Sequence, residues 1–343
     1  MENKLIEKDL ILNAKGVKKY FPVQSSFLKR TIGYVKAVDH VDISIYEGKT
    51  FGLVGESGCG KTTFGRCLLR AIEPTAGSIR FRTSDGDMKE IVGMDKGDLR
   101  RIRRDMQMIF QDPYSSLNPW MIVRDIVGEP LKRNNICGGK ELAARVMELM
   151  ELVSLDPRHL KRYPHAFSGG QRQRIGIARA LATNPRLIVC DEAVSALDVS
   201  VQAQIINLLQ KLQTLLNLSY LFISHDLSVI QHISDQVGVM YVGKVVELAA
   251  SDALFARPLH PYTEALLSAK PIPDPRLRAD KILIEGEIAS PANPPQGCYF
   301  HPRCKYVKPM CKQAYPEFRE IESGHFAACH RAEDLSLKGV YRL

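Results

Sequence analysis

The sequence has no apolar run long enough to cross a membrane as a helix. Such a helix needs about 20 consecutive apolar residues, and the longest runs here have the length of a strand, as at residues 187–190. The first nine residues are polar and mixed in charge, so they lack the apolar core of a secretory signal. We therefore expect a chain without a membrane span that stays in the compartment where it is made.

Internal repeats and low-complexity tracts are also absent. The 343 residues are 45% hydrophobic, enough for a substantial core. At about 100–200 residues per domain, the length suggests two or three compact units. The net charge is +9, but the positive residues are scattered, and no aromatic residues interleave with the one tight arginine cluster at residues 100–104. A single-stranded nucleic acid needs such an aromatic platform, so we expect no nucleic-acid partner.

The eight cysteines fall into two groups, one dispersed and one crowded near the C-terminus. Disulfides are rare in the reducing compartment expected for a chain without an export signal. Four thiolates close together then indicate a metal centre, either an iron–sulfur cluster or a tetrahedral Zn²⁺ site. Their spacing matches neither a common zinc pattern nor a bacterial ferredoxin run, and free thiols are the simpler alternative. The four are Cys298, Cys304, Cys311 and Cys329; nearby His301, His325 and His330 are possible substitute ligands, although surface histidines are the simpler interpretation.

Hydrophobic periodicity indicates an α/β fold. Short apolar runs at residues 51–54, 187–190 and 220–223 have the length of buried strands. Apolar residues recur at helical spacing over residues 142–153 and 201–215. Strands that alternate with helices are typical of a parallel sheet covered by helices.

Three further features suggest the domain organisation. Residues from about 112 to 174 are mostly helical in pattern and interrupt the alternation, which predicts an inserted helical subdomain. Two apolar runs that flank Gly243 predict a hairpin. Prolines multiply after residue 257, so we predict one domain over residues 1–257 and a Pro-rich extension over residues 258–343 that needs a metal or the domain itself for stability.

Residues 55–62, Gly-Glu-Ser-Gly-Cys-Gly-Lys-Thr, match the phosphate-binding P-loop pattern in full. Glycines let successive N–H groups turn toward phosphate oxygens, and the following helix adds the positive end of its dipole. Lys61 is placed to reach the terminal phosphates and the Thr62 hydroxyl to bind Mg²⁺. A chance Gly-rich turn is disfavoured, because the motif follows a predicted strand and opens a helix. The predicted cradle is Gly55, Ser57, Gly58, Cys59, Gly60, Lys61, Thr62 and Thr63.

The strand predicted at residues 187–190 ends in Asp191-Glu192. Carboxylates at the C-terminal ends of parallel strands lie where α/β sheets bind ligands. We therefore predict that Asp191 holds Mg²⁺, directly or through water, and that Glu192 is the general base for the attacking water.

A second Gly-rich turn opens another helix, within Phe-Ser-Gly-Gly-Gln at residues 167–171. A P-loop ATPase already has its own phosphate cradle, so a second phosphate contact is expected to bind the nucleotide of a partner. The simpler alternative is a helix N-cap at Ser168. The predicted contact residues are Ser168, Gly169, Gly170 and Gln171.

With these motifs the sequence resembles the ATP-binding subunits of ABC transporters over roughly residues 10 to 250. Residues 168–171 are similar to the family signature, and Gln111, Asp198 and His225 fall where the family has its Q-loop, D-loop and switch histidine. The resemblance implies an ABC cassette: a RecA-like P-loop NTPase core with an antiparallel β subdomain and an inserted helical subdomain. Ala193 stands where members commonly have proline.

The resemblance also implies roles for these residues. His225 would contact the γ-phosphate, and Gln111 would sense Mg²⁺ and the attacking water. Phe21, with Tyr20 as the alternative, would stack on adenine. Two cassettes would pair head to tail, with each ATP between one P-loop and the opposite signature, and Asp198 would lie near that contact.

Three segments, residues 20–23, 110–119 and 258–263, resemble the peptide-transporter subfamily. They are similar to the F-type ATP-binding subunit of dipeptide and oligopeptide permeases. This implies a homologous second ATPase subunit, two permease chains that dock near residues 114–119, and an external peptide-binding protein. It further implies a peripheral position at the cytoplasmic face of the inner membrane and, because some members carry one, a [4Fe–4S] cluster on the four C-terminal cysteines.

Two other functions compete with peptide import. One is the import of nickel or another small solute, since the ATPase touches no substrate. The other is a soluble ABC ATPase outside transport. Translation-type members usually carry two cassettes, and repair-type members need long coiled coils; this chain shows one P-loop and no sustained heptads.

Overall fold

The computed structural model describes residues 9–24, 30–269 and 282–340. Residues 1–8, most of the stretch used above to exclude a secretory signal, lie outside these ranges. Three prolines of the predicted extension, at positions 271, 273 and 275, also lie outside them. The chain forms two compact units. Unit 1 comprises residues 1–13, 44–50 and 80–223, and unit 2 comprises residues 14–43, 51–79 and 224–343.

The centre of unit 1 is a group of parallel strands, β6 (Met106–Ile109), β7 (Leu187–Asp191) and β8 (Ser219–Ile223). β7 lies between the other two, and every residue of β7 and β8 is buried. Continuous apolar runs are typical of strands covered on both faces. Helix α6 (Gly169–Leu181) packs against β6 and against α7 (Val199–Leu216). The predicted parallel α/β arrangement is confirmed.

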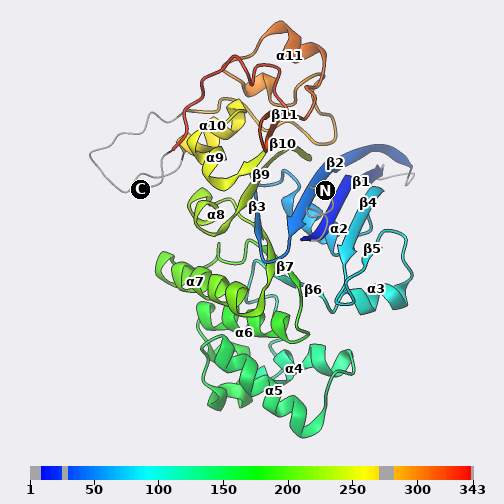
Figure 1. Ribbon diagram of the computed structural model, residues 1–343, viewed down its shortest axis with the longest axis vertical. Coiled ribbons are helices and arrows are strands. Elements are labelled where there is room, and N and C mark those ends of the chain that lie inside the picture. Colours follow the sequence, from blue (N-terminus) through cyan, green and yellow to red (C-terminus); the bar gives the residue numbers. More distant parts are fainter. Residues whose placement is uncertain (1–8, 25–29, 270–281, 341–343) are drawn as a thin grey trace. The chain divides into compact units, whose positions relative to one another are not determined.

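The helical part of unit 1 lies between β6 and β7 in sequence (Figure 1). Its elements are α4 (Val123–Arg133), α5 (Gly139–Leu152) and two short 3₁₀ helices, η1 (Pro157–Lys161) and η2 (Pro164–Ala166). α4 packs on both α5 and α6, and Gly128 allows a close approach of Leu142 and Val146. These helices occupy the predicted range of 112–174; whether they move as a separate subdomain stays a prediction.

Three strands have residues in both units: β1 (Leu10–Gln24), β2 (Thr31–Tyr46) and β4 (Ala76–Arg82). With β5 (Met88–Glu90) they form a sheet in the order β2-β1-β4-β5. β4 and β5 pair antiparallel, and the short helix α3 (Lys96–Ile102) follows with Asp95 as its N-cap.

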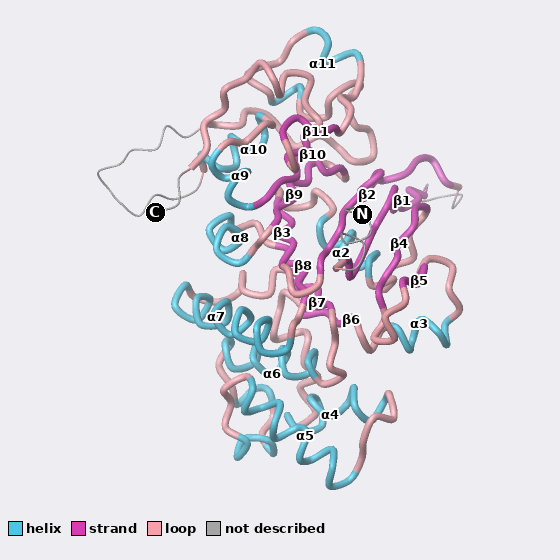
Figure 2. The backbone as a smooth tube through the Cα atoms, in the orientation of Figure 1, coloured by secondary structure: helices cyan, strands magenta, loops and turns pink. Residues whose placement is uncertain are grey.

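In unit 2, the strands follow the order β11-β12-β10-β9-β3. They are β3 (Thr50–Val54), β9 (Gln236–Tyr241), β10 (Lys244–Ala250), β11 (Arg319–Glu322) and β12 (His325–Ala327). Figure 2 shows β3, β9, β10 and β11 among the strands in magenta. β3 and β9 pair in parallel, whereas β9 and β10 are antiparallel. Val242 and Gly243 join β9 to β10 with positive φ angles of 42° and 78°. This confirms the hairpin predicted around Gly243.

The helices of unit 2 are α2 (Lys61–Leu68), α8 (Leu227–Ile233), α9 (Ser251–Ala256), α10 (Pro261–Ser268) and α11 (Pro309–Gln313), with the 3₁₀ helix η3 (His301–Arg303). The C-terminal segment is joined to the sheet, because β12 pairs with β10 with Glu247 opposite Ala327. The segment therefore belongs to the same unit as the P-loop, and the domain boundary predicted near residue 257 stays a prediction.

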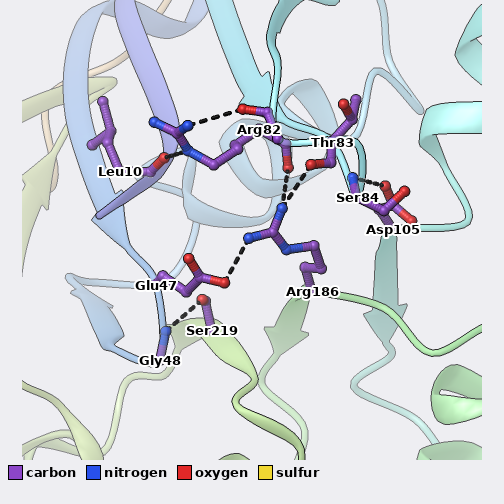
Figure 3. A network of polar contacts seen from close by, with 10 residues as sticks. Leu10, Glu47, Gly48, Arg82, Thr83, Ser84, Asp105, Arg186 and Ser219 are labelled. Atoms are coloured by element: carbon purple, nitrogen blue, oxygen red, sulfur yellow. Dashed lines mark hydrogen bonds and ion pairs between the residues drawn. The ribbon is translucent and has the colours of Figure 1, made fainter. Parts of the chain in front are cut away.

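The guanidinium of Arg186, just before β7, holds several segments of unit 1 together (Figure 3). It donates to Glu47 Oε1 at 2.5 Å, to the Thr83 carbonyl at 2.7 Å and to the Arg82 carbonyl at 3.3 Å. The Arg82 side chain in turn donates to the carbonyl of Leu10 at 2.9 Å. The Arg186 side chain is 23% exposed, so these bonds are partly shielded from water.

We expect Arg186→Met to destabilise unit 1 by about 2 kcal/mol, because Glu47 and two carbonyls lose a charged donor in partly buried surroundings. The measurement is a comparison of thermal unfolding midpoints. A suitable control is Arg101→Met, since Arg101 pairs with Asp98 at 2.9 Å but is 78% exposed, and exposed pairs contribute little. Equal midpoints for the two variants would contradict a structural role of Arg186.

Candidate nucleotide-binding site

The P-loop of unit 2 connects β3 to α2 and contains three glycines with positive φ angles. These are 151° at Gly55, 78° at Gly58 and 109° at Gly60. A Cβ atom at Gly55 would lie 2.1 Å from the carbonyl oxygen of Met240, and one at Gly60 would lie 2.0 Å from that of Ala37. Only glycine fits these positions. The predicted strand–loop–helix context is confirmed.

Lys61 is the first residue of α2 and is only 4% exposed. Its ammonium donates to the carbonyl of Gly55 at 2.7 Å and to that of Glu56 at 2.9 Å, and lies 3.7 Å from Cys59 Sγ. The charge is therefore held across the loop by the loop itself. Backbone N–H groups at the start of α2, this ammonium and the neighbouring Thr62 hydroxyl form the donor set that a triphosphate with Mg²⁺ requires.

Two contacts to the P-loop were not predicted from the sequence. The Glu56 N–H donates to the Tyr262 hydroxyl at 2.8 Å. The Glu56 carboxylate accepts two hydrogen bonds from Arg303, at 2.7 and 3.0 Å. Both partners come from the C-terminal segment, and no local sequence signal indicates either pairing.

Unit 2 also contains the two candidates for adenine stacking. The Tyr20 hydroxyl donates to Asp39 at 2.5 Å, and burial together with this carboxylate raises the pKa of Tyr20. Phe21 is 38% exposed, with the ammonium of Lys19 5.0 Å from its ring centroid. The Phe21 ring is therefore the more accessible of the two, and its stacking on adenine stays a prediction.

In unit 2, His225 lies between Ser224, whose backbone is hydrogen-bonded to β3, and Asp226, the N-cap of α8. The Ser224 N–H donates to the carbonyl of Leu53 in β3 at 3.2 Å. The Asp226 side chain caps α8 by accepting from the N–H groups of Ser228 and Val229. His225 is thus next to a residue that is hydrogen-bonded to β3, and its contact with the γ-phosphate stays a prediction.

In unit 1, the structure brings Gln111 and Glu192 together. Gln111 Nε2 donates to Glu192 Oε2 at 2.6 Å. The backbone of Glu192 has a φ angle of 48°, unusual for a residue with a side chain, and its N–H donates to the carbonyl of Ile223 at 3.0 Å. Asp191, the last residue of β7, is 2% exposed. The predicted base and the predicted Q-loop residue are therefore hydrogen-bonded partners.

The D-loop continues from Glu192. The Ser195 hydroxyl donates to the Glu192 carbonyl at 3.0 Å. Asp198 is the N-cap of α7, where it accepts from the Ser200 hydroxyl at 2.7 Å and the Val201 N–H at 2.9 Å. These bonds hold the pKa of Asp198 below its usual value. The observed role of Asp198 is helix capping, and its proximity to a nucleotide stays a prediction.

The signature residues lie at the start of α6, where Ser168 is exposed, Gly169 and Gln171 are half-buried, and Gly170 is buried. Ser168 is the N-cap in a capping box with Gln171, whose side chain accepts from the Ser168 N–H at 3.0 Å. A Cβ atom at Gly170 would lie 2.4 Å from Val201 Cγ1, so this glycine allows α6 to approach α7. Gly169 lies beside Leu197 of the D-loop. The helix N-cap at Ser168, which was the simpler alternative, is therefore present. The contact of these residues with a partner's nucleotide stays a prediction.

The four C-terminal cysteines line one cavity in unit 2, together with His260, Phe300 and Tyr306. The Cys298 N–H donates to the Cys311 carbonyl at 2.8 Å. Burial raises the pKa of Cys298 to about 12 and that of Cys329 to about 11, and the neighbouring thiols add to both shifts. Within the described ranges, no group of three or more His, Cys, Asp or Glu side chains has the geometry of a site for a metal ion.

The histidines considered as substitute ligands have other partners. His325 is 3% exposed and its Nε2 lies 2.7 Å from Glu247 Oε1, so the interpretation of His325 as a surface residue was wrong. His301 Nδ1 lies 2.9 Å from the Cys298 carbonyl oxygen, and His330 Nε2 lies 2.9 Å from that of Ala314.

Two family descriptions match the chain. The family described as "ABC transporter" matches residues 38–195. The family described as "Oligopeptide/dipeptide transporter, C-terminal region" matches residues 246–311. The helices of the described residues include none with the length and hydropathy of a membrane span.

Known proteins are similar over nearly the whole chain. The oligopeptide transport ATP-binding protein AppF of Bacillus subtilis (strain 168) is 52% identical over 94% of this chain and 98% of its own length. A putative oligopeptide transport ATP-binding protein of the same organism, YkfD, is 53% identical over 92% of this chain and 94% of its own. The solved dimer of the cassette MJ0796 with ADP and Pi has a TM-score of 0.61 and 28% identity, covering 70% of this chain and 99% of that one.

The P-loop and its parallel strands define a P-loop ATPase of the ATP-binding cassette type. The chain belongs to the family of ABC transporter ATP-binding proteins. The resemblance drawn from the sequence motifs is thereby confirmed.

We expect Glu192→Gln to lower ATP turnover by roughly 10²–10⁴-fold, the usual contribution of a general base, while ATP remains bound. The neutral amide keeps the hydrogen bond to Gln111 but cannot accept a proton from water. The measurements are steady-state hydrolysis and equilibrium nucleotide binding. Glu148→Gln, which alters an exposed ion pair with Arg145 in the same unit, is the control. Unimpaired hydrolysis by the Glu192 variant would rule out its role as base.

Proposed function

We propose that this chain is the ATP-hydrolysing subunit that powers the import of dipeptides and oligopeptides through a membrane ABC transporter. The observation that carries the proposal is the presence, in one chain, of an ABC cassette match and a match to the peptide-transporter C-terminal region. Relatives named for oligopeptide transport are similar over nearly their full lengths, which supports the same assignment. No contact in the described residues favours nickel import or a role outside transport.

The residues of unit 2 would bind the triphosphate. The N–H groups of the P-loop and the Lys61 ammonium would stabilise the charge on the β- and γ-phosphates. Phe21 would stack on adenine, and His225 would contact the γ-phosphate. Thr62 would bind Mg²⁺, which supplies charge neutralisation when bound with ATP; Asp191 and Gln111, which belong to unit 1, are the other predicted Mg²⁺ ligands.

The residues of unit 1 would act on the attacking water. Glu192 would accept its proton, and Gln111 is placed to orient that carboxylate through the 2.6 Å hydrogen bond. The fixed backbone of Glu192, bonded to Ile223, limits how far the carboxylate can move. Positioning and charge stabilisation supply most of the rate acceleration in phosphoryl transfer.

A homologous second ATPase subunit would complete the site. Ser168, Gly169, Gly170 and Gln171 at the start of α6 would contact the nucleotide of that partner. Closure of the pair on ATP would then drive two permease chains. The complex would lie at the cytoplasmic face of the plasma membrane as a peripheral assembly, fed by an external peptide-binding protein.

The segment after Gln111 is suited to contact the permease chains. Tyr114 is 60% exposed and Trp120 is 87% exposed, and apolar rings at this exposure are typical of binding surfaces. The Arg172 guanidinium lies 4.0 Å from the centroid of the Tyr114 ring. This contact joins the segment to the signature helix α6, so a displacement of Tyr114 would displace Arg172 of α6 as well.

We also propose a [4Fe–4S] cluster on Cys298, Cys304, Cys311 and Cys329. All four line one cavity. Among the described residues, no group of three or more His, Cys, Asp or Glu side chains is arranged to hold a single metal ion. A single Zn²⁺ draws four sulfurs to about 2.3 Å, whereas a cluster of several irons needs its thiolates farther apart. The cluster would cross-link the C-terminal segment and so stabilise it, and its binding would offset the free-energy cost of ionising buried thiols.

The function is tested by assembling this chain with its partner ATPase and the permease chains in membranes. We expect ATP hydrolysis that rises severalfold when a peptide-loaded binding protein is added, because closure of the cassettes is coupled to the permease. Empty binding protein is the control. Stimulation by nickel instead of peptide, or a chain that fails to join permease subunits, would contradict the proposal.

The cluster is tested by anaerobic purification and analysis of iron, sulfide and zinc. We expect iron and sulfide in equal amounts, visible absorbance, and loss of both in Cys304→Ser, because one ligand of the cluster is missing. Cys137→Ser, which changes a cysteine outside the cavity, is the control and should keep full iron content. Zinc without sulfide would support the alternative metal, and metal-free protein with intact thiols would support neither.

A further inference from the structure

Glu56 of the P-loop is held through three of its groups. Its carbonyl accepts from Lys61 at 2.9 Å, and its N–H donates to the hydroxyl of Tyr262 at 2.8 Å. Its carboxylate is bound by both terminal nitrogens of Arg303 at 2.7 and 3.0 Å. The C-terminal segment therefore fixes both the peptide unit and the side chain of a residue inside the phosphate-binding loop.

Arg303 is committed to this contact. Its side chain is 6% exposed and that of Glu56 is 23% exposed, so the pair is largely shielded from water. The two hydrogen bonds that Arg303 donates to the Glu56 carboxylate raise the pKa of Arg303, which stays charged. A further, longer contact of 3.5 Å joins Arg303 to the Tyr241 hydroxyl, and its buried Nε has no hydrogen-bond partner in the described part of the chain.

The turn that carries Arg303 is bounded by two of the cysteines. The 3₁₀ helix η3 spans His301–Arg303 and ends directly before Cys304; Tyr299 and Phe300 separate it from Cys298. The His301 N–H donates to the Cys298 carbonyl at 3.0 Å, and the Cys304 N–H donates to the His301 carbonyl at 3.4 Å. A group bound by both thiols would therefore fix the same turn.

Aromatic packing connects this turn to the P-loop from a second direction. The ring centroid of Phe300 lies 5.4 Å from that of Tyr241 and 5.3 Å from that of Tyr262. Tyr262 is fully buried and bears the hydroxyl that receives the Glu56 N–H. A displacement of η3 would thus disturb the Glu56 carboxylate through Arg303 and the Glu56 peptide through Tyr262.

We propose that Arg303 is a positioning residue for ATP binding, which neutralises and orients Glu56 in the P-loop and is itself held in place by the cysteine-lined cavity. This inference rests on the proposed role of the P-loop in binding ATP and on the proposed occupation of the cavity. An unpaired carboxylate beside the triphosphate would repel it. The bidentate pair removes that repulsion and keeps the loop in the shape that its glycines permit.

The first test uses the assembled transporter and the variant Arg303→Gln. We expect the KM for ATP to rise roughly tenfold with a smaller change in kcat, because ground-state binding suffers and the base in unit 1 is untouched. Glu56→Gln combined with Arg303→Gln should restore most of the affinity, since no unpaired charge is left. Arg303→Lys should fall between wild type and Arg303→Gln.

The control is Arg319→Gln, because Arg319 forms a bidentate pair with Glu333 at 3.0 and 3.1 Å in the same segment, but exposed and without contact to the P-loop. An ATP KM in Arg303→Gln equal to that of Arg319→Gln would refute the role of Arg303 while leaving the ATPase assignment intact. A loss of ATP affinity in the double variant equal to that in Arg303→Gln would show that Arg303 has only a structural role. A wild-type complex that binds no ATP would refute the proposed function and the inference together.

The link to the cavity is tested by Cys304→Ser in the same assembly. We expect it to raise the KM for ATP severalfold in the wild-type background and to add little to Arg303→Gln, because both changes act through the same turn. Removal of the bound metal from the intact complex with a chelator should have the same effect as the substitution. Independent, additive effects of Cys304→Ser and Arg303→Gln would overturn the link.

Discussion

Residues 55–60 must hold their backbone N–H groups on one side of a tight loop, and this requirement shapes their surroundings in unit 2. Positive φ angles at the loop glycines meet it locally. The loop is also in close contact with the carbonyls of Met240 and Ala37, which leave no space for a Cβ atom at Gly55 or Gly60. A peptide loop in this conformation has little intrinsic stability, so β9 and the C-terminal segment are needed to maintain it.

Much of this fold can be predicted from the sequence because its signals are local. Continuous apolar runs bounded by turns identify the buried strands β3, β7 and β8. The P-loop is recognised because its chemistry requires glycines at fixed positions. The hairpin at Gly243 follows from a turn residue between two apolar runs. The pairing of Gln111 with Glu192 could be expected only from family resemblance, since 81 positions separate the two residues.

Contacts between residues far apart in the chain could not be predicted, because no local sequence signal indicates them. Arg303 lies 247 positions from Glu56, and His325 lies 78 positions from Glu247. Glu247 is fully buried, and it accepts hydrogen bonds from the N–H groups of Leu259 and His260 in addition to its contact with His325. Nothing in the residues near Glu247 distinguishes it from a solvated charge. The left-handed backbone of Glu192 is likewise a result of tertiary context, because the local sequence carries no glycine there.

The pairing of β12 with β10 has a consequence for the order in which the protein forms during synthesis. β12 (His325–Ala327) lies far downstream of the P-loop in the chain and is therefore made long after it. Domains generally fold as units during synthesis, N-terminal domains first. The sheet of unit 2 lacks β12 until residues 325–327 have been made, and the Glu56 carboxylate lacks its partner until Arg303 has been made. The nascent chain thus completes the contacts of its phosphate-binding loop only after Arg303 and β12 have been synthesised, long after the loop itself.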